Sequence, residues 1–313
     1  GIPMLIDFKK TKKPIYSWFA RGNNFSYIAA SQADQVFMSP VGELSILGSR
    51  LNVTYFAKTL EKLGVQAELI KTGAFKSAGE RFTMNQPSQA VAKMLRSLRF
   101  EIQKNLSIMT KKSRKKASYA DIEAWYQKSI FYSDEALKHG VVDSLEYLES
   151  AKSIFAKKLG AKPYLFSSYA AESIVASLSR SQDDHDGLAL IEANGQIIMS
   201  RSGGMSQDGD EIVAFDLINK LDWAQKNKKI KAVILKVSSP GGDAIASDLI
   251  AQKIRELKKV KPIVTLMGTQ AASGGYYIAA PTNKIIANPS TITGSIGVFG
   301  LFPNFKKSQE KFG

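Results

Sequence analysis

Two glycine-containing turns in the C-terminal third of the chain have the residue types that acyl-transfer chemistry needs. The run Ala272-Ser273-Gly274-Gly275-Tyr276 offers a serine hydroxyl on a tight turn, followed by glycines that leave the backbone N–H groups unobstructed. The run Ser239-Pro240-Gly241-Gly242 is typical of a backbone cradle for a negatively charged oxygen. Enzymes that form acyl intermediates combine such a nucleophile with such donors. The two turns therefore predict serine acyl-transfer chemistry, for which the rest of the chain must supply a base.

The elements around these turns would place both at one edge of a sheet. Residues 231–237 and 262–267 have the apolar content of buried strands, and residues 244–257 between them have the periodicity of a helix. Each glycine turn follows one of the two strands. Since α/β folds bind ligands at the carboxyl ends of parallel strands, we expect an α/β fold with its active site at this edge.

The usual bases for a catalytic serine are scarce in this chain. There is no cysteine, which excludes thiol catalysis, cysteine-bound zinc and disulfides, and there are only two histidines. His139 stands at a predicted helix end, where histidine commonly caps carbonyl groups, and His185 stands in a polar run typical of a linker. A Ser-His-Asp triad is therefore not expected, and a lysine becomes the leading candidate for the base.

The composition limits the class of protein and its partners. The 313 residues suffice for about two domains, and 44% hydrophobic with 23% charged residues is typical of a folded globular chain. No apolar run reaches the roughly 18 residues that span a bilayer, and the N-terminus does not resemble a signal peptide. The net charge of +15 would suit an anionic lipid surface. Nucleic acid is not expected as a partner, because no stacking aromatic platform accompanies the basic residues, and we interpret the basic cluster at 111–116 as a solvated loop in preference to a membrane contact.

The sequence contains an internal repeat with an offset of about 249 residues. The run Tyr27-Ile28-Ala29-Ala30 matches Tyr277-Ile278-Ala279-Ala280, and similar matches lie on either side of it. Where the second copy has its serine and glycines, the first copy has Asn23-Asn24-Phe25-Ser26, and no glycine follows Ser26. The first copy therefore lacks a usable nucleophile.

Both copies are incomplete, so the chain is expected to be an internal part of a longer protein. The first copy begins within a predicted helix, and the second ends soon after another helix begins near residue 304. We expect a first partial repeat over residues 1–160, a linker over 161–187, and a second partial repeat over 188–313. The predicted fold class is α/β, a tandem repeat of α/β domains with a helical connection.

Lys76 stands in a sequence context that suits a buried amine. The run Phe75-Lys76-Ser77-Ala78-Gly79-Glu80 surrounds the lysine with small residues and one aromatic ring. With this run, Gly140-Val141-Val142-Asp143, Thr293-Gly294-Ser295-Ile296-Gly297 and the two glycine turns, the chain resembles the signal peptide peptidase A family in its long tandem-repeat form. The serine and glycine motifs are shared with the Clp protease proteolytic subunit and the crotonase superfamily, whereas the lysine motif in one repeat with the serine in the other is more specific.

The resemblance implies a serine endopeptidase with a Ser-Lys dyad that degrades cleaved signal peptides. Ser273 matches the nucleophile, Lys76 the general base, and Ser295 a serine that hydrogen-bonds the lysine. The oxyanion hole would come from the N–H of Gly274 and of one glycine of the Gly241-Gly242 turn. A lysine is a base at neutral pH only when burial lowers its pKa, so the neighbouring Glu80 should point away from it.

The resemblance also implies partners and a location. The substrates would be apolar peptide segments and the protein a homotetramer. It would act on the periplasmic or extracytoplasmic face of the inner (plasma) membrane, reached through segments outside this chain. No metal or organic cofactor is expected.

Two other functions stay open on the sequence. A crotonase-like acyl-CoA enzyme would use the same glycine cradle but needs a nearby carboxylate, for which Asp243 is the candidate and a helix N-cap the competing interpretation. A non-catalytic oligomeric scaffold would need neither the serine nor the lysine motif, and the presence of both argues against it.

Overall fold

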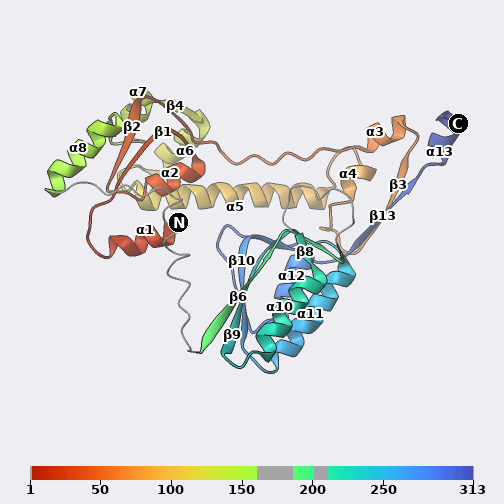
Figure 1. Ribbon diagram of the computed structural model, residues 1–313. Helices are drawn as coiled ribbons and strands as arrows, with labels where there is room; N and C mark the ends of the chain where they lie inside the picture. The colour runs from red at the N-terminus through yellow and green to blue at the C-terminus, as the bar shows by residue number, and fades with distance from the viewer. Residues whose placement is uncertain (1, 161–185, 201–210, 313) are drawn as a thin grey trace. The chain divides into compact units, whose positions relative to one another are not determined.

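The computed structural model describes residues 2–160, 186–200 and 211–312, which form a mixed α/β protein (Figure 1). The chain divides into two compact units. The first unit comprises Gly1–Leu51 with Ser97–Ser181, and the second comprises Asn52–Arg96 with Gln182–Gly313. A segment of the first sequence repeat thus belongs to the same compact unit as the second repeat. The repeat boundaries themselves stay a prediction, and almost all of the proposed linker at 161–187, including His185, lies outside the described residues.

The second unit is built on a parallel sheet with the strand order β11-β10-β9-β6. The strands of this sheet are β6 (Gly187–Asn194), β9 (Ile230–Ser239), β10 (Ile263–Ala272) and β11 (Lys284–Ile286), and β12 (Ile292–Gly294) also pairs with β10. Helices α10 (Ala214–Lys226), α11 (Ala244–Lys258) and α12 (Gly274–Ala279) connect them along the chain, as in βαβ units. Strands β7 (Gln196–Ile198) and β8 (Glu211–Val213) pair with each other in a separate two-stranded sheet. The predicted strands and helix of this region are confirmed, and β10 runs five residues beyond its predicted end at Met267.

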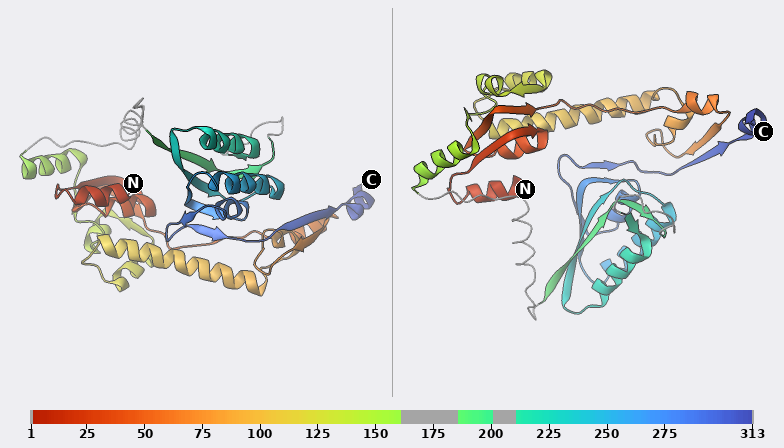
Figure 2. Two further views of the ribbon diagram at one scale, coloured as in Figure 1. Left: turned by 90° about the horizontal axis from the view of Figure 1, so that it is seen from below. Right: turned by 45° about the horizontal axis from the view of Figure 1, so that its top comes forward.

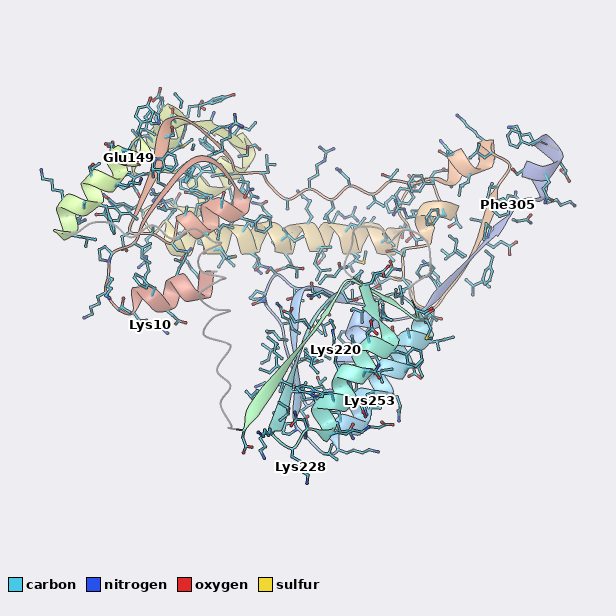
Figure 3. The ribbon with its side chains drawn as sticks, in the orientation of Figure 1. Lys10, Glu149, Lys220, Lys228, Lys253 and Phe305 are labelled. Atoms are coloured by element: carbon cyan, nitrogen blue, oxygen red, sulfur yellow. The ribbon has the colours of Figure 1, made fainter. Side chains whose placement is uncertain are left out.

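The core of this unit lies between the sheet and the helices on one of its faces, α10 and α11 (Figure 1). Alternate residues of β9, among them Val233, Leu235 and Val237, are almost fully buried against apolar residues of these helices. An ion pair also connects the two helices: Lys253 Nζ of α11, in the residue labelled in Figure 3, lies 2.6 Å from Asp222 Oδ1 of α10. This rigid layer fixes the strand ends from which both glycine turns emerge.

A separate two-stranded ribbon completes the second unit. Strand β3 (Gln66–Lys71) pairs antiparallel with β13 (Phe299–Asn304), with Lys71 opposite Phe299 (Figure 2). Helices α3 (Ala57–Lys62), α4 (Glu80–Thr83) and α13 (Lys306–Phe312) flank the ribbon in sequence. Strand β13 occupies a stretch for which the sequence predicts no strand, and the helix expected from residue 304 begins at Lys306. The ribbon brings the lysine segment of the first repeat to the end of the second.

The first unit has a smaller sheet of order β1-β2-β4, with β5 also paired to β2. Its elements are α1 (Ile2–Lys9), β1 (Tyr16–Asn23), α2 (Asn24–Ala30), β2 (Gln35–Ser45), α6 (Tyr119–Lys128), β4 (Ile130–Tyr132), α7 (Ser133–Lys138), β5 (Ser144–Leu145) and α8 (Leu148–Leu159). The long helix α5 (Gln89–Ser113) begins in the second unit and continues into the first. Ser118 caps α6, since its hydroxyl accepts a hydrogen bond from the N–H of Asp121. Over the described ranges, no helix combines the length and apolarity that crossing a bilayer requires.

Candidate active site

Ser273 occupies a strained turn between a strand and a helix. It follows the last residue of β10 and caps α12, with φ 52° and ψ −120°. A side chain in this region of positive φ is held there only when its surroundings fix the backbone. Here the Ser273 N–H donates to the carbonyl of Gly294 at 2.9 Å, in register with the parallel pairing of β10 and β12. The turn therefore presents the hydroxyl at the carboxyl edge of the sheet, where the sequence predicts it.

The Pro-Gly-Gly turn packs directly against the serine. Gly241 has φ 100°, and a side chain there would place its Cβ 2.7 Å from the Gly274 nitrogen, so only glycine fits. The Gly241 N–H donates to Ser239 Oγ at 3.1 Å. Ile197 bonds to the Gly241 carbonyl and to the Asp243 N–H, both at 2.9 Å, so the Gly242 N–H between them faces away from Ile197.

Of the three glycines predicted for the oxyanion hole, Gly242 and Gly274 are thus the better candidates. Gly274 begins α12, and the first N–H groups of a helix have no acceptor within the helix. Both glycines line the same cavity as Ser273. Gly241 supports them through its close approach, with its own N–H already bonded to Ser239.

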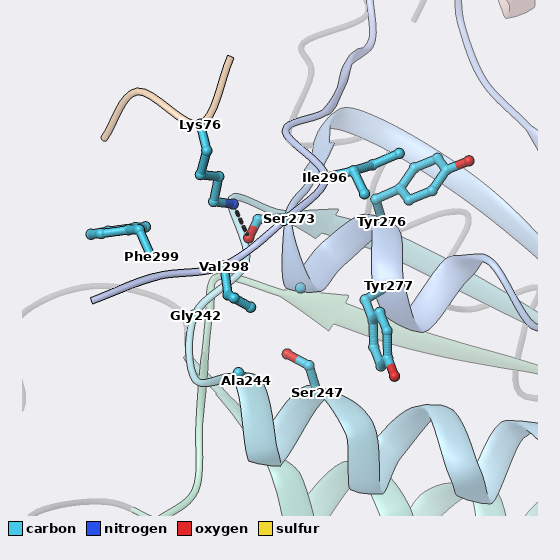
Figure 4. A pocket seen from close by; sticks show the side chains of 12 residues that line it. Lys76, Gly242, Ala244, Ser247, Ser273, Tyr276, Tyr277, Ile296, Val298 and Phe299 are labelled. Carbon is cyan, nitrogen blue, oxygen red and sulfur yellow. Dashed lines mark hydrogen bonds between the residues drawn. The ribbon is translucent and has the colours of Figure 1, made fainter. Parts of the chain in front are cut away.

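Lys76 reaches the serine from the loop that follows β3 (Figure 4). Its Nζ lies 2.8 Å from Ser273 Oγ, 2.7 Å from the backbone carbonyl of Ser295 and 3.3 Å from Ser295 Oγ. The expected proximity of Lys76 and Ser273 is confirmed. Ser295 contacts the lysine as expected too, although its backbone carbonyl, which no sequence motif indicates, makes the shorter contact.

The position of Lys76 depends on backbone contacts next to the ribbon. The Thr72 N–H donates to the Val298 carbonyl at 3.0 Å, which continues the pairing of β3 with β13. Gly297, at φ 122°, lies so close that a Cβ there would be 2.6 Å from the Thr72 carbonyl. The lysine loop and the Ser295 loop are therefore packed backbone against backbone.

The Lys76 amine is buried, and among the described residues its hydrogen-bond partners are uncharged. The residue is 4% exposed, and these partners are hydroxyl and carbonyl oxygens. Burial lowers the pKa of Lys76, because the charged form loses its hydration. Glu80, which could have cancelled this effect, forms a 2.5 Å contact with Lys71 instead. The expectation that Glu80 points away from the lysine is thus in agreement with its contacts.

A cavity of about 500 Å³ opens beside the serine and lysine (Figure 4). Apart from Ser273, Lys76 and the glycines, most of its lining is apolar or aromatic: Ala244, Tyr276, Tyr277, Ile296, Val298 and Phe299, with Ser247 as a further polar member. The hydroxyl of Ser247 is already bonded to the Asp243 carbonyl at 2.7 Å. The cavity can therefore accept an apolar side chain of a ligand whose carbonyl carbon lies at Ser273.

In the first unit, the turn between β1 and α2 corresponds to the Ser273 turn, and its polar side chains are hydrogen-bonded within the unit. Asn23 is paired with Ser45 as Ala272 is paired with Gly294, so Asn24 stands at the place of Ser273. The Asn24 amide bonds to both the carbonyl and the N–H of Leu47, at 2.6 and 2.7 Å. Neighbouring Ser26 completes a capping box with Asn23. The first copy carries no serine on this turn, in agreement with the sequence analysis.

The remaining candidate residues have structural contacts. Asp243 caps α11 by accepting a hydrogen bond from the Ala246 N–H at 2.7 Å, as its competing interpretation predicts. His139 ends α7 in the first unit. The basic cluster at 111–116 begins inside α5 and is not simply a solvated loop, because Lys111 bonds to two backbone carbonyls and Arg114 pairs with Asp143 at 2.8 Å.

A serine on a strand-to-helix turn, a buried lysine and backbone donors in an α/β fold define a serine-hydrolase type of site. Comparison with known proteins agrees. The chain belongs to peptidase family S49, which it matches over residues 7–162 and 255–313. This confirms the predicted family, and the two matched segments are consistent with the predicted repeat fold.

Curated relatives match nearly the whole chain. It is 32% identical to Protease 4 of Haemophilus influenzae, over 98% of this chain and 51% of the relative, and 29% identical to the chloroplastic serine protease SPPA of Arabidopsis thaliana, over 99% and 46%. The chain therefore spans about half the length of these relatives. Among solved structures, the 1510-N membrane-bound stomatin-specific protease in complex with a substrate peptide is 23% identical, with a TM-score of 0.29, over 36% of this chain and 46% of that one.

Proposed function

We propose that this chain carries the catalytic centre of a serine endopeptidase with a Ser-Lys dyad, which degrades cleaved signal peptides at the membrane. The observation that carries the proposal is the 2.8 Å separation of Ser273 Oγ and Lys76 Nζ. Membership of a peptidase family supports the reaction class.

In the proposed reaction, neutral Lys76 accepts the Ser273 hydroxyl proton as the oxygen attacks the peptide carbonyl carbon. A neutral amine has two N–H donors and one lone pair. The two donors fit the Ser295 carbonyl and hydroxyl, which leaves the lone pair for Ser273. These uncharged acceptors orient the amine, and they carry no negative charge that would favour its protonated form.

The oxyanion that forms would be stabilised by the N–H groups of Gly242 and Gly274. Each such donor is typically worth about 3 kcal/mol of barrier. Lys76 then gives its proton to the leaving amine, and the C–N bond breaks to leave an ester on Ser273. A water molecule, deprotonated by Lys76, attacks this ester and releases the second product.

The apolar cavity next to the serine supports peptides with apolar side chains as substrates. The family resemblance adds the signal-peptide source, a homotetramer and an extracytoplasmic position at the inner membrane. It also supplies the division into repeats at 1–160 and 188–313. These parts of the proposal can be tested by cross-linking and by cell fractionation of the full-length protein.

The dyad is tested with full-length protein and a fluorogenic peptide that has an apolar segment. Wild-type protein should cleave it, Ser273→Ala and Lys76→Met should cleave it at least about a hundredfold more slowly, and the exposed lysine variant Lys62→Met should behave as wild type. Cleavage by folded Ser273→Ala at the wild-type rate would exclude the proposed centre.

A further inference from the structure

Buried Glu80 forms an ion pair with partly exposed Lys71 next to the site, and the proposed reaction does not use this pair. Glu80 is 3% exposed, and one carboxylate oxygen lies 2.5 Å from Lys71 Nζ. The same carboxylate accepts hydrogen bonds from the hydroxyl and the N–H of Ser88, at 3.1 and 3.3 Å. A carboxylate with this many donors is held in one orientation.

The pair closes the base of the loop that carries Lys76. Lys71 is the last residue of β3 and Glu80 the first of α4, and the loop at 72–79 runs between them. Within that loop Lys76 is the one ionisable side chain, since the others are Thr, Gly, Ala, Phe and Ser. The ion pair therefore fixes both ends of a short segment whose single ionisable side chain contacts Ser273.

Glu80 and Lys76 also have different surroundings: Glu80 is paired with a charged group, whereas Lys76 contacts uncharged oxygens. Burial by itself opposes ionisation of Glu80, but the hydrogen bonds from Lys71 and Ser88 outweigh it and lower the pKa of the carboxyl group. A further titratable group that the Glu80 charge affects is Tyr55, whose pKa is raised by burial and by that charge. The groups in contact with Lys76 are the uncharged oxygens of Ser273 and Ser295.

We infer that Lys71 and Glu80 are positioning residues for the proposed base: their ion pair closes the loop and keeps the nearby carboxylate neutralised, so that Lys76 remains without a counter-charge. The inference rests on the proposed function, in which Lys76 acts as a neutral amine. If the pair only held the loop in place, removing either of its charges would not displace the pH dependence of Lys76 in opposite directions.

The test compares the pH dependence of kcat/KM in full-length Lys71→Met, Glu80→Gln and the double variant. Lys71→Met leaves an unpaired negative charge that favours protonated Lys76, so the rising limb should move to higher pH. Glu80→Gln leaves an unpaired positive charge, so the limb should move to lower pH. Coulomb's law gives a displacement of about one pH unit, or tenfold in rate below the limb, for any unit charge about 10 Å from an amine at an effective dielectric constant of about 20, and we expect displacements of this order.

The double variant should return the limb to its wild-type position, and Lys71→Arg, which keeps the pair, should leave it there. Opposite displacements that the double variant reverses support the inference, and any other pattern in folded protein overturns it. Unfolding curves of each variant establish that it is folded. The proposed function fails separately, if Lys76→Met retains wild-type turnover.

Discussion

Replacing Lys76 tests the proposed base most directly, because the structure gives its amine one role that no neighbour can take over. Among the described residues, this amine is the one nitrogen within hydrogen-bonding distance of Ser273 Oγ, at 2.8 Å. Loss of a general base typically costs 10²- to 10⁴-fold in rate, or about 3 to 5 kcal/mol of barrier. We expect Lys76→Met and Lys76→Arg each to lose at least this much activity. Arginine keeps the positive charge but cannot be deprotonated, so it cannot act as the base.

The role of Lys76 as a base also predicts the direction in which kcat/KM changes with pH. Burial lowers the pKa of Lys76, so kcat/KM of the wild type should rise with pH through that lowered value and level off above it. The limb should be absent from the residual activity of Lys76→Met. The rate is measured from pH 5 to 10 with the fluorogenic peptide on full-length protein, and Lys62→Met, a change on the exposed side of α3, serves as the matched control.

Stability supplies a readout that does not involve turnover. Below the folded-state pKa of Lys76 both states are protonated and the cost of burying the ammonium is fully present. Between that value and the unfolded pKa of about 10.4 the unfolded state binds more protons, so unfolding free energy should rise with pH by up to about 1.4 kcal/mol per unit relative to Lys76→Met. Parallel stability curves for the two proteins, or wild-type turnover by Lys76→Arg, would refute the assignment.

Three further predictions concern the residues around the lysine. Ser273→Ala should lower peptide hydrolysis by about 10⁴-fold or more while leaving the circular dichroism spectrum unchanged, because the methyl group keeps the shape of the turn and loses the nucleophile. Ser295→Ala should lower kcat only about tenfold, since the closer 2.7 Å contact to Lys76 comes from the backbone carbonyl that alanine retains; an unchanged kcat would remove the hydroxyl from the mechanism. Gly241→Ala should lower the free energy of unfolding in urea by clearly more than Gly73→Ala does. Gly73 has the similar φ of 91° but open space around it, so its substitution measures only the backbone strain of about 1 kcal/mol. Equal losses would contradict the close packing of Gly241 against Ser273.

The sequence predicted the parallel sheet and its catalytic edge because local signals and tertiary structure agree there. Strand β9 and helix α11 each show the period of their own element, and the turns after β9 and β10 contain glycines that few other environments require. The position of the motif around Ser273 at a strand end therefore follows from the sequence. The positive φ of Ser273 and of Ser295 left no such signal, since serine is not a residue that predicts this conformation.

What the sequence did not predict was the ribbon of β3 and β13. Phe299-Gly300-Leu301-Phe302-Pro303-Asn304 contains glycine and proline, which disfavour a strand when it is read alone. It becomes a strand because it lies at an edge, paired on one side with β3. Pairing between segments so far apart along the chain cannot be deduced from either segment, so the contact of Lys76 with Ser273 rested on family resemblance alone.

The site is thus held together by two kinds of structure with different stabilities. Ser273 and the glycine cradle stand on a packed sheet whose buried residues form one continuous core. Lys76 stands beside a two-stranded ribbon, and such a ribbon is marginally stable by itself in water. Its position therefore depends on the close contact of Gly297 with Thr72, on the hydrogen bond from Thr72 to Val298, and on the Lys71–Glu80 pair at the base of the loop. Because these contacts are polar or backbone contacts, a change outside the hydrophobic core can separate the proposed base from the nucleophile while leaving the sheet folded.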